Sequence, residues 1–147
     1  MRLSNHSDYA LRVLIYLGSL PDAHPPVRLQ DIADAYDISA NHVAKVVQRL
    51  AHLDVIEATR GRGGGILLKK APEDINVGYV FRVMEPSFTL VPCFSGGDGC
   101  KISQCCGLQH ILSKAKQAFL QTLDEYTVAD AIESPAVTAN LLGIEIA

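Results

Sequence analysis

Apolar residues recur at intervals of three and four along most of this chain, which is the spacing of helices that bury one face. The first such stretch covers residues 7–20. We expect Ser7 or Asn5 to cap its first turn and Pro21 to end it, because hydroxyl and amide side chains satisfy free N–H groups and proline cannot continue a helix. The amino-terminal segment is therefore predicted to be one amphipathic helix.

Two shorter helical patterns follow over residues 29–36 and 40–53, with Asp37, Ile38 and Ser39 between them. Ser39 stands at the position that caps the second of these helices. The inward positions of the second helix are all apolar: Val43, Val46, Val47, Leu50 and Leu53. Two short helices joined by so short a turn predict a helix-turn-helix, whose second helix enters the major groove of DNA.

Two short strands are predicted next, over residues 55–59 and 65–69, and the glycine-rich segment RGRGGG joins them. Strand-forming residues on both sides of a glycine-rich tip are typical of a β-hairpin. A basic hairpin directly after a helix-turn-helix has the position of a wing, which reaches the neighbouring minor groove or the DNA backbone. The first half of the chain is therefore predicted to be a winged helix-turn-helix.

Three more helical patterns occupy the second half of the chain. Residues 75–85 lie between Pro72 and Pro86, a long helix is expected over residues 107–126, and a short one within residues 128–142. The long pattern carries an apolar stripe over its whole length. Such a stripe favours packing against a second subunit, so we expect a homodimer.

The predicted fold class is mainly α with a small β-hairpin wing, a winged helix-turn-helix followed by a long dimerisation helix. Residues 1–72 are expected to form the DNA-binding domain, and residues 73–147 the cysteine-bearing loop and the dimerisation helix. The chain has 147 residues, of which 48% are hydrophobic. Both values are sufficient for a proper hydrophobic core.

Composition excludes several classes of protein. No apolar run approaches the roughly 18–20 residues of a membrane span, so we expect a cytoplasmic protein without a membrane partner. The sequence has no phosphate-binding loop, no paired acids and no serine–histidine–aspartate set, and its five histidines are scattered. We therefore do not expect an enzyme. An electron carrier would have no need for a winged helix.

The basic residues gather in the region that would face DNA. The whole chain has a net charge of −3, but residues 40–72 contain six basic and two acidic residues. Phosphate binding needs a local basic face rather than a basic chain. The residues expected to contact DNA lie on the outer face of the second helix and at the hairpin tip: Asn41, His42, Lys45, Gln48, Arg49, Arg60 and Arg62. A solvated helix face and a simple turn are the alternative interpretation.

All four cysteines fall within residues 93–106, in the segment CFSGGDGCKISQCC. In a reducing compartment, clustered cysteines are more often metal-binding or redox-active than structural disulfides. Six residues separate Cys93 from Cys100, and five separate Cys100 from Cys106. Such wide gaps differ from the close pairs of zinc sites and ferredoxins, and suit a cluster that takes its fourth ligand from elsewhere. Adjacent cysteines seldom bind one metal, so Cys105 is expected to be a spare thiol.

The last of these cysteines comes directly before the long helix. The free N–H groups and the dipole of a helix start favour an anionic thiolate–sulfide cluster. Three alternatives remain open on the residues alone: a thiol–disulfide sensor, a zinc-dependent regulator without a cluster, and incidental packing of four cysteines in one loop. Free cysteines usually disperse through protein cores, which argues against incidental packing.

The chain resembles the Rrf2 family of bacterial winged-helix regulators over nearly its whole length. The resemblance rests on the opening SDYALRVLIYL, the helix-turn-helix IADAYDISANHVAKVVQRL, the wing TRGRGGGILL, the segment INVGYVFRVMEP and the cysteine loop ending in CGL. Within that family, the opening SDY, the segment SANHVAKVV and the cysteine spacing resemble the nitric-oxide-sensitive repressors most.

This resemblance implies a homodimer that binds a palindromic operator in double-stranded DNA and carries one iron–sulfur cluster per subunit. It implies a 4Fe–4S cluster, with 2Fe–2S as the alternative, held by Cys93, Cys100 and Cys106 and by Asp8 from the partner subunit. Without the resemblance, Asp8 would be read as an acid that complements a helix dipole. The extra thiol of Cys105 and the SGGDG insertion depart from the family pattern and bear on cluster type and stability.

These inferences combine into a prediction of function. We expect a transcriptional repressor whose operator affinity is controlled by an iron–sulfur cluster that senses nitric oxide. The alternative within the same family is a regulator that responds to iron availability or to redox state.

Overall fold

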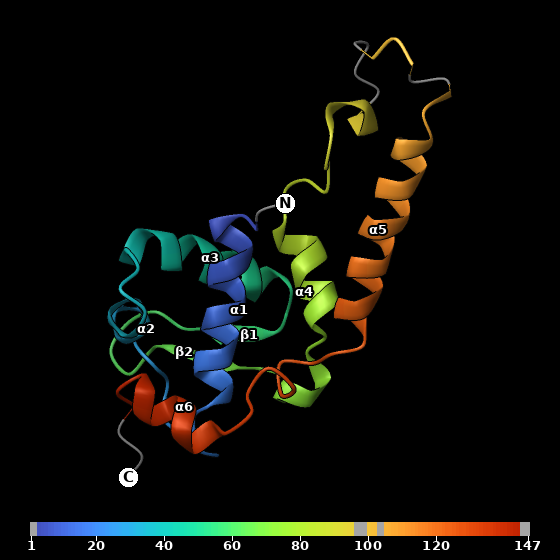
Figure 1. The fold of residues 1–147 in the computed structure, drawn as a ribbon. Helices are drawn as coiled ribbons and strands as arrows, with labels where there is room; N and C mark the ends of the chain where they lie inside the picture. The colour runs from blue at the N-terminus through green and yellow to red at the C-terminus, as the bar shows by residue number, and fades with distance from the viewer. Residues whose placement is uncertain (1–2, 96–99, 103–104, 145–147) are drawn as a thin grey trace.

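The computed structural model describes residues 3–95, 100–102 and 105–144. Their order is three helices, a two-stranded hairpin and three further helices, with two short 3₁₀ turns between them (Figure 1). The bounds are α1 Asn5–Gly18, α2 Leu29–Ala35, α3 Ala40–His52, β1 Ile56–Ala58, β2 Ile66–Leu68, η1 Pro72–Asp74, α4 Val77–Met84, η2 Pro92–Ser95, α5 Gly107–Asp124 and α6 Pro135–Leu141. This mainly helical fold with a β-hairpin confirms the predicted fold class.

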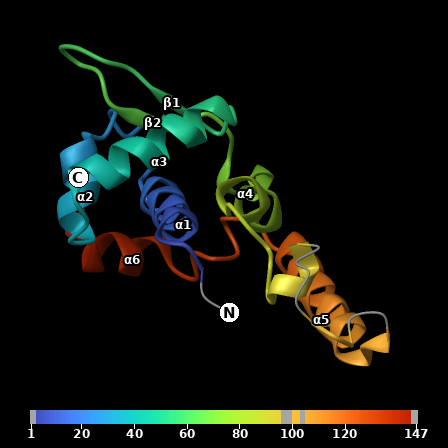
Figure 2. The same ribbon diagram turned by 90° about the horizontal axis from the view of Figure 1, so that it is seen from above.

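Helix α1 is at the centre of the molecule. Figure 2 looks along it and shows the hairpin and α5 extending on opposite sides of it. Residues Ala10 and Leu14 of α1, Val43 and Leu50 of α3, and Val80 of α4 are all fully buried. Burial of such aliphatic side chains is the main favourable contribution to folding. The amino-terminal helix therefore packs against both the helix-turn-helix and α4, the helix that precedes the cysteine-bearing segment.

The helix-turn-helix has the predicted form. Asp37 adopts a left-handed backbone conformation with φ 52° in the turn, a conformation that aspartate tolerates better than most residues. The side chain of Ser39 accepts a hydrogen bond from the backbone N–H of His42 and caps α3, as the sequence predicts. Val43, Val46, Val47 and Leu50 are buried, while Leu53 lies just beyond the helix and is half-buried.

The wing is a short antiparallel hairpin in which Ile56 pairs with Leu68 and Ala58 with Ile66. Ile66 also exchanges backbone hydrogen bonds with Val27, which ties the hairpin to the segment before α2. Gly61 has φ 97° at the tip, a value that side-chain-bearing residues rarely adopt. Each strand is one residue shorter at both ends than its predicted range, although backbone hydrogen bonds still join Thr59 to Gly65 and Lys69 to Val55.

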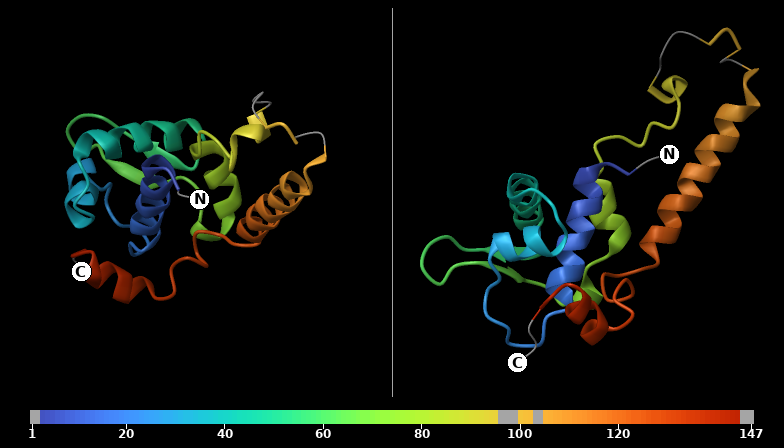
Figure 3. Two further views of the ribbon diagram at one scale, coloured as in Figure 1. Left: turned by 45° about the horizontal axis from the view of Figure 1, so that its top comes forward. Right: turned by 60° about the vertical axis from the view of Figure 1, so that its left-hand side comes forward.

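Helix α5 lies beside α4 at its carboxyl end, while its amino end stands away from the rest of the molecule (Figures 1 and 3). None of its residues is buried in the single chain. Its apolar contact with α4 centres on Phe119, whose ring packs edge-on against Phe81 with centroids 5.6 Å apart. Much of the apolar stripe that the sequence predicts is therefore exposed.

Two predicted helix starts were wrong. Ser4 caps α1, because its Oγ accepts a hydrogen bond from the backbone N–H of Ser7 at 3.2 Å, so neither Ser7 nor Asn5 is the cap. Helix α4 begins at Val77 and not at residue 75, since the residues after Pro72 form a separate 3₁₀ turn and Asn76 supplies the cap.

Candidate functional site

The outer face of α3 is available for a partner. The five polar residues expected to contact DNA are all exposed: Asn41, His42, Lys45, Gln48 and Arg49. The opposite face of the same helix is packed into the core. The predicted division of this helix into an inner and an outer face is therefore correct, and contact with DNA stays a prediction.

A groove of about 720 Å³ runs between α3 and the hairpin. Lys45 and Gln48 line it from α3, and Arg60 lines it from the wing. Three predicted contact residues, two from α3 and one from the wing, thus face one hollow. The other four, which are exposed but are not among its lining residues, are Asn41, His42, Arg49 and Arg62.

The groove contains two basic residues that the sequence analysis did not single out, Arg28 and His52. The side chain of Arg28 is 79% exposed, and its Nη2 lies 2.6 Å from Oδ1 of Asp31. This hydrogen bond holds the pKa of the Asp31 carboxyl below its usual range. Arg28 directly precedes α2 and lies outside residues 40–72, the basic segment identified from the sequence. Its place in the groove becomes evident only from the way the hairpin packs beside it.

The wing tip carries two exposed guanidinium groups, those of Arg60 and Arg62. At the base of the same hairpin, Lys69 forms an ion pair with Asp54. This bond holds the pKa of the Asp54 carboxyl below its usual range. Part of the positive charge at the hairpin base is therefore neutralised within the protein.

The thiol-bearing segment lies at the far end of α5. Cys106 is half-buried and is the residue immediately before α5, with extended backbone and no side-chain hydrogen bond to the helix. Cys100 and Cys105 are exposed, and all three are free thiols. The backbone of Cys93 forms part of the turn η2, while its side chain and residues 96–99 of the SGGDG insertion lie outside the described residues.

A hollow of about 640 Å³ lies beside these thiols, and its lining includes Cys105, Cys106 and Gly107. Lys116 and Phe94 line it as well, and the Lys116 ammonium lies 5.1 Å from the centre of the Phe94 ring. This cation–π contact connects the turn that carries Cys93 to the helix that follows Cys106. Within the described residues, no three histidine, cysteine or acidic side chains are close enough together to hold a metal ion.

Asp8, the expected fourth ligand, lies in the first turn of α1. Its carboxylate pairs with Arg12, with 2.9 Å between Oδ2 and Nε, and its side chain is 42% exposed. The guanidinium of Arg12 also lies 5.6 Å from the centre of the Tyr36 ring, at the end of α2. Burial raises the pKa of Tyr36 to about 12, so this ring stays neutral. The structure does not bring Asp8 into a group with cysteines of its own chain, as far as these are described.

The neighbouring Tyr9 connects α1 with the recognition helix. Its ring centroid lies 6.0 Å from that of His42, one of the predicted DNA-contacting residues, and the planes are tilted by 38°. This separation is within the range of aromatic packing. The first turn of α1 therefore contacts the start of α3 directly.

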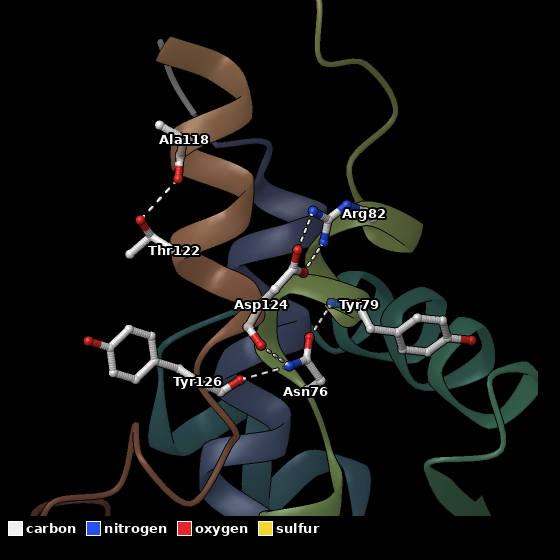
Figure 4. Close-up of polar contacts among 7 residues, drawn as sticks. All are labelled: Asn76, Tyr79, Arg82, Ala118, Thr122, Asp124 and Tyr126. Carbon is white, nitrogen blue, oxygen red and sulfur yellow. Dashed lines mark hydrogen bonds and ion pairs between the residues drawn. The ribbon is translucent and has the colours of Figure 1, made fainter. Parts of the chain in front are cut away.

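A polar junction joins α4 to the end of α5 (Figure 4). The side-chain oxygen of Asn76 accepts a hydrogen bond from the N–H of Tyr79, and its amide nitrogen donates to the carbonyl of Asp124 at 2.7 Å. Arg82 of α4 forms a two-point ion pair with the Asp124 carboxylate. One asparagine and one aspartate thus fix where α5 leaves the body of the protein.

Comparison with known proteins identifies the family. The family model described as Rrf2, iron-dependent transcriptional regulator, matches residues 3–134. This chain belongs to the Rrf2 family. The HTH-type transcriptional regulator NsrR of Bacillus licheniformis is 50% identical to it over 133 residues, which cover 90% of this chain and 92% of that protein. NsrR of Bacillus subtilis is 45% identical over 146 residues, which cover 97% of each chain.

Solved structures agree with the Rrf2 fold. CymR of Bacillus subtilis, described as its global cysteine regulator, aligns with a TM-score of 0.69 at 22% identity over 89% of this chain and 95% of that one. IscR of T. potens aligns with a TM-score of 0.70 at 23% identity, over 90% and 87% respectively. The predicted place within the family agrees with these relatives, since four of them, 41–50% identical to this chain, are named NsrR.

Membership of the Rrf2 family makes this protein a DNA-binding transcriptional regulator and not an enzyme. Among the described residues, no helix is both long enough and apolar enough to cross a membrane. The site residues predicted from the sequence remain predictions.

Proposed function

We propose that this regulator is a homodimeric repressor whose affinity for a palindromic operator is controlled by an iron–sulfur cluster that senses nitric oxide. The observation that carries the proposal is the sequence similarity to proteins named NsrR over nearly the whole chain. The alignment with NsrR of Bacillus subtilis covers 97% of this chain. We retain residues 1–72 as the DNA-binding part and residues 73–147 as the sensing and dimerising part.

The ligands proposed for the cluster are Cys93, Cys100, Cys106 and the partner subunit's Asp8. The donor chemistry fits, because the described cysteines are free thiols and soft thiolates are the ligands of iron–sulfur clusters. Cys106 stands at a helix start without a side-chain cap, and the free N–H groups there favour a negatively charged group. The cluster is proposed to be 4Fe–4S, with 2Fe–2S as the alternative.

When bound, such a cluster supplies iron that reacts with nitric oxide, and a carboxylate is a harder and more exchangeable ligand for it than a thiolate. The rest of the response depends on the chain itself. Asp8 would hold the cluster from the first turn of α1, and Tyr9, the next residue, contacts His42 at the start of α3. A change at the ligand would therefore reach the recognition helix through one contact between adjacent helices.

On DNA, the first turns of α3 are proposed to meet base edges, because asparagine and basic side chains suit the donor and acceptor pattern of the major groove. Lys45, Gln48 and Arg60 face the same groove of the protein, so one DNA backbone would pass between the helix and the wing. Arg62 and Arg49 would add contacts to phosphates or the minor groove.

The second subunit is proposed to cover α5. Its Leu108 and Ile111 are 58% and 63% exposed in the single chain. Large apolar side chains in a row along a helix mark an interface rather than a solvated surface. A two-fold axis at this helix would place two recognition helices to read half-sites about one DNA turn apart.

One experiment tests the proposal as a whole. The protein is purified without oxygen, its iron and sulfide are determined, and binding to a palindromic operator is measured before and after nitric oxide over a salt series. We expect iron and acid-labile sulfide in the dimer, tight sequence-dependent binding, and its loss with nitric oxide. Operator binding that is identical with and without the cluster would exclude cluster control.

A second candidate is favoured by the description of the matching family as iron-dependent. In this case the same residues would report iron availability, and the cluster would be absent when iron is scarce. Iron starvation without nitric oxide, compared with nitric oxide in iron-replete medium, distinguishes the two by which treatment releases the operator first.

A further inference from the structure

The start of α1 is capped by a residue that is distant in the sequence. Ser4 supplies the local cap to the N–H of Ser7. In addition, Oε2 of Glu85 accepts hydrogen bonds from the Ser4 backbone N–H at 3.1 Å, from the Ser4 hydroxyl at 3.0 Å and from the Ser7 hydroxyl at 2.7 Å. In a local capping box, a glutamate three residues after the cap would bind that backbone N–H. Ser7 occupies this position here, and the carboxylate comes instead from Glu85, which lies 81 residues after Ser4 in the sequence.

The environment of this carboxylate keeps it charged. Ser7 is fully buried and Glu85 is half-buried. Burial alone would raise the pKa of the Glu85 carboxyl, but the hydrogen bonds from Ser7 and Ser4 outweigh burial and hold it below its usual value. A negative charge at this place also interacts favourably with the positive end of the α1 dipole.

The cap lies between the two functional parts of the protein. Glu85 directly follows α4, and Pro86 after it begins the segment that leads to the cysteines. On the other side, the capped turn contains Asp8, whose backbone N–H bonds to the carbonyl of Ser4 at 3.1 Å. Tyr9 of the same turn contacts His42 of the recognition helix.

We propose that Glu85 is a positioning residue that holds the first turn of α1 against the base of the cysteine loop and thereby sets the placement of Asp8. A side chain with this role touches neither the cluster nor DNA. The part that concerns Asp8 as a ligand rests on the function proposed above, whereas the capping of α1 does not.

The cap is tested first in protein without a cluster. Amide hydrogen exchange is measured in the parent, in Glu85→Gln, in Ser7→Ala and in the control Glu133→Gln, which neutralises an exposed acid elsewhere. We expect the amides of residues 7–9 to exchange about tenfold faster in the first two variants, the effect of losing roughly one helix cap. The control should match the parent. Unchanged exchange in Glu85→Gln would overturn the proposal.

The effect on Asp8 is tested with the cluster present. Cluster loss to an iron chelator is followed by its visible absorption, and we expect a lifetime several-fold shorter in Glu85→Gln and Ser7→Ala than in Glu133→Gln. The double variant should lose its cluster no faster than the single variant with the shorter cluster lifetime, because both substitutions break the same contact. Faster exchange with an unchanged cluster lifetime would reduce Glu85 to a structural cap and overturn its positioning role.

The two proposals fail in different ways. If the parent takes up no iron and sulfide, the proposed function is wrong, and the exchange measurement still decides whether Glu85 caps α1.

Discussion

Arg82 and Asp124 form a two-point ion pair that joins α4 to the last residue of α5. The same aspartate packs so closely against Gly78 that any side chain there would collide with its backbone nitrogen. A long exposed helix is thus held to the body of the protein at one end, where Asn76 also binds the Asp124 carbonyl.

Asp124→Asn should lower the free energy of unfolding by about 0.5–1 kcal/mol, the usual range for a partly exposed ion pair. The physical reason is that the neutral asparagine amide has one acceptor oxygen and no charge. It therefore cannot replace the carboxylate that accepts from both Arg82 nitrogens. Urea unfolding at low and at high salt measures it, since salt screens the pair and should shrink the difference. Glu125→Gln, a neutralised neighbour, is the matched control, and an equal loss in both variants would contradict the assignment.

Stability should fall at acid pH partly through Glu85. Its folded-state pKa lies below its ordinary value of 4.5, so the carboxylate stabilises the folded state at higher pH, and this contribution is lost as the pH falls through the folded-state pKa. Glu85→Gln should therefore be less stable than the parent near neutral pH, and the difference should shrink as the pH falls below the ordinary glutamate pKa of 4.5. Thermal unfolding across this range checks it, and a constant difference would show that the charge of Glu85 is irrelevant.

Arg60→Ala should weaken operator binding more than Arg62→Ala, because Arg60 lines the groove beside α3 and Arg62 does not. We expect a loss of about 1–3 kcal/mol if Arg60 reads a base edge, and less for a phosphate contact alone. Titration of operator DNA over a salt series separates a base-edge contact from a phosphate contact. Lys114→Ala on α5 controls for the loss of one positive charge, and equal affinities in all three variants would remove the wing from recognition.

Cys93→Ala, Cys100→Ala and Cys106→Ala should each abolish stable cluster binding, whereas Cys105→Ala should largely retain it. The first three are the cysteines that the resemblance to the family implies as ligands, and Cys106 stands at the start of α5. Iron and sulfide analysis of the four anaerobically purified variants decides between them. Full iron content in Cys106→Ala together with loss in Cys105→Ala would reverse the two assignments.

Asp8→Ala should still form a dimer with a cluster, but the cluster should be lost sooner and the response of DNA binding to nitric oxide should be blunted. Asp8→Cys should slow the response, because a thiolate is a softer ligand for iron. Rapid mixing with nitric oxide, followed by absorption and operator release, measures both. Arg12→Gln breaks the ion pair but keeps the carboxylate, so it separates loss of a ligand from loss of the pair.

The sequence by itself determined the order of the elements and several of their ends. The apolar spacing of α3 and the hydroxyl of Ser39 located the recognition helix to within one residue, Ala40–His52 against an expected 40–53. Both signals are local, because one helix face and one cap involve residues within a few positions of each other. The glycine-rich tip located the hairpin for the same reason.

Only the tertiary structure decided which distant residues meet. Ser7 was expected to cap α1, but its hydroxyl donates to Glu85, 78 residues away, and Ser4 is the cap. Arg28 reaches the groove because the hairpin packs beside the segment before α2. Periodicity carries no information about such contacts, since they depend on how separately formed elements pack. The resemblance to the family named Asp8 and three cysteines as candidate ligands, and their proposed joining across two subunits depends on an assembly that local sequence patterns do not encode.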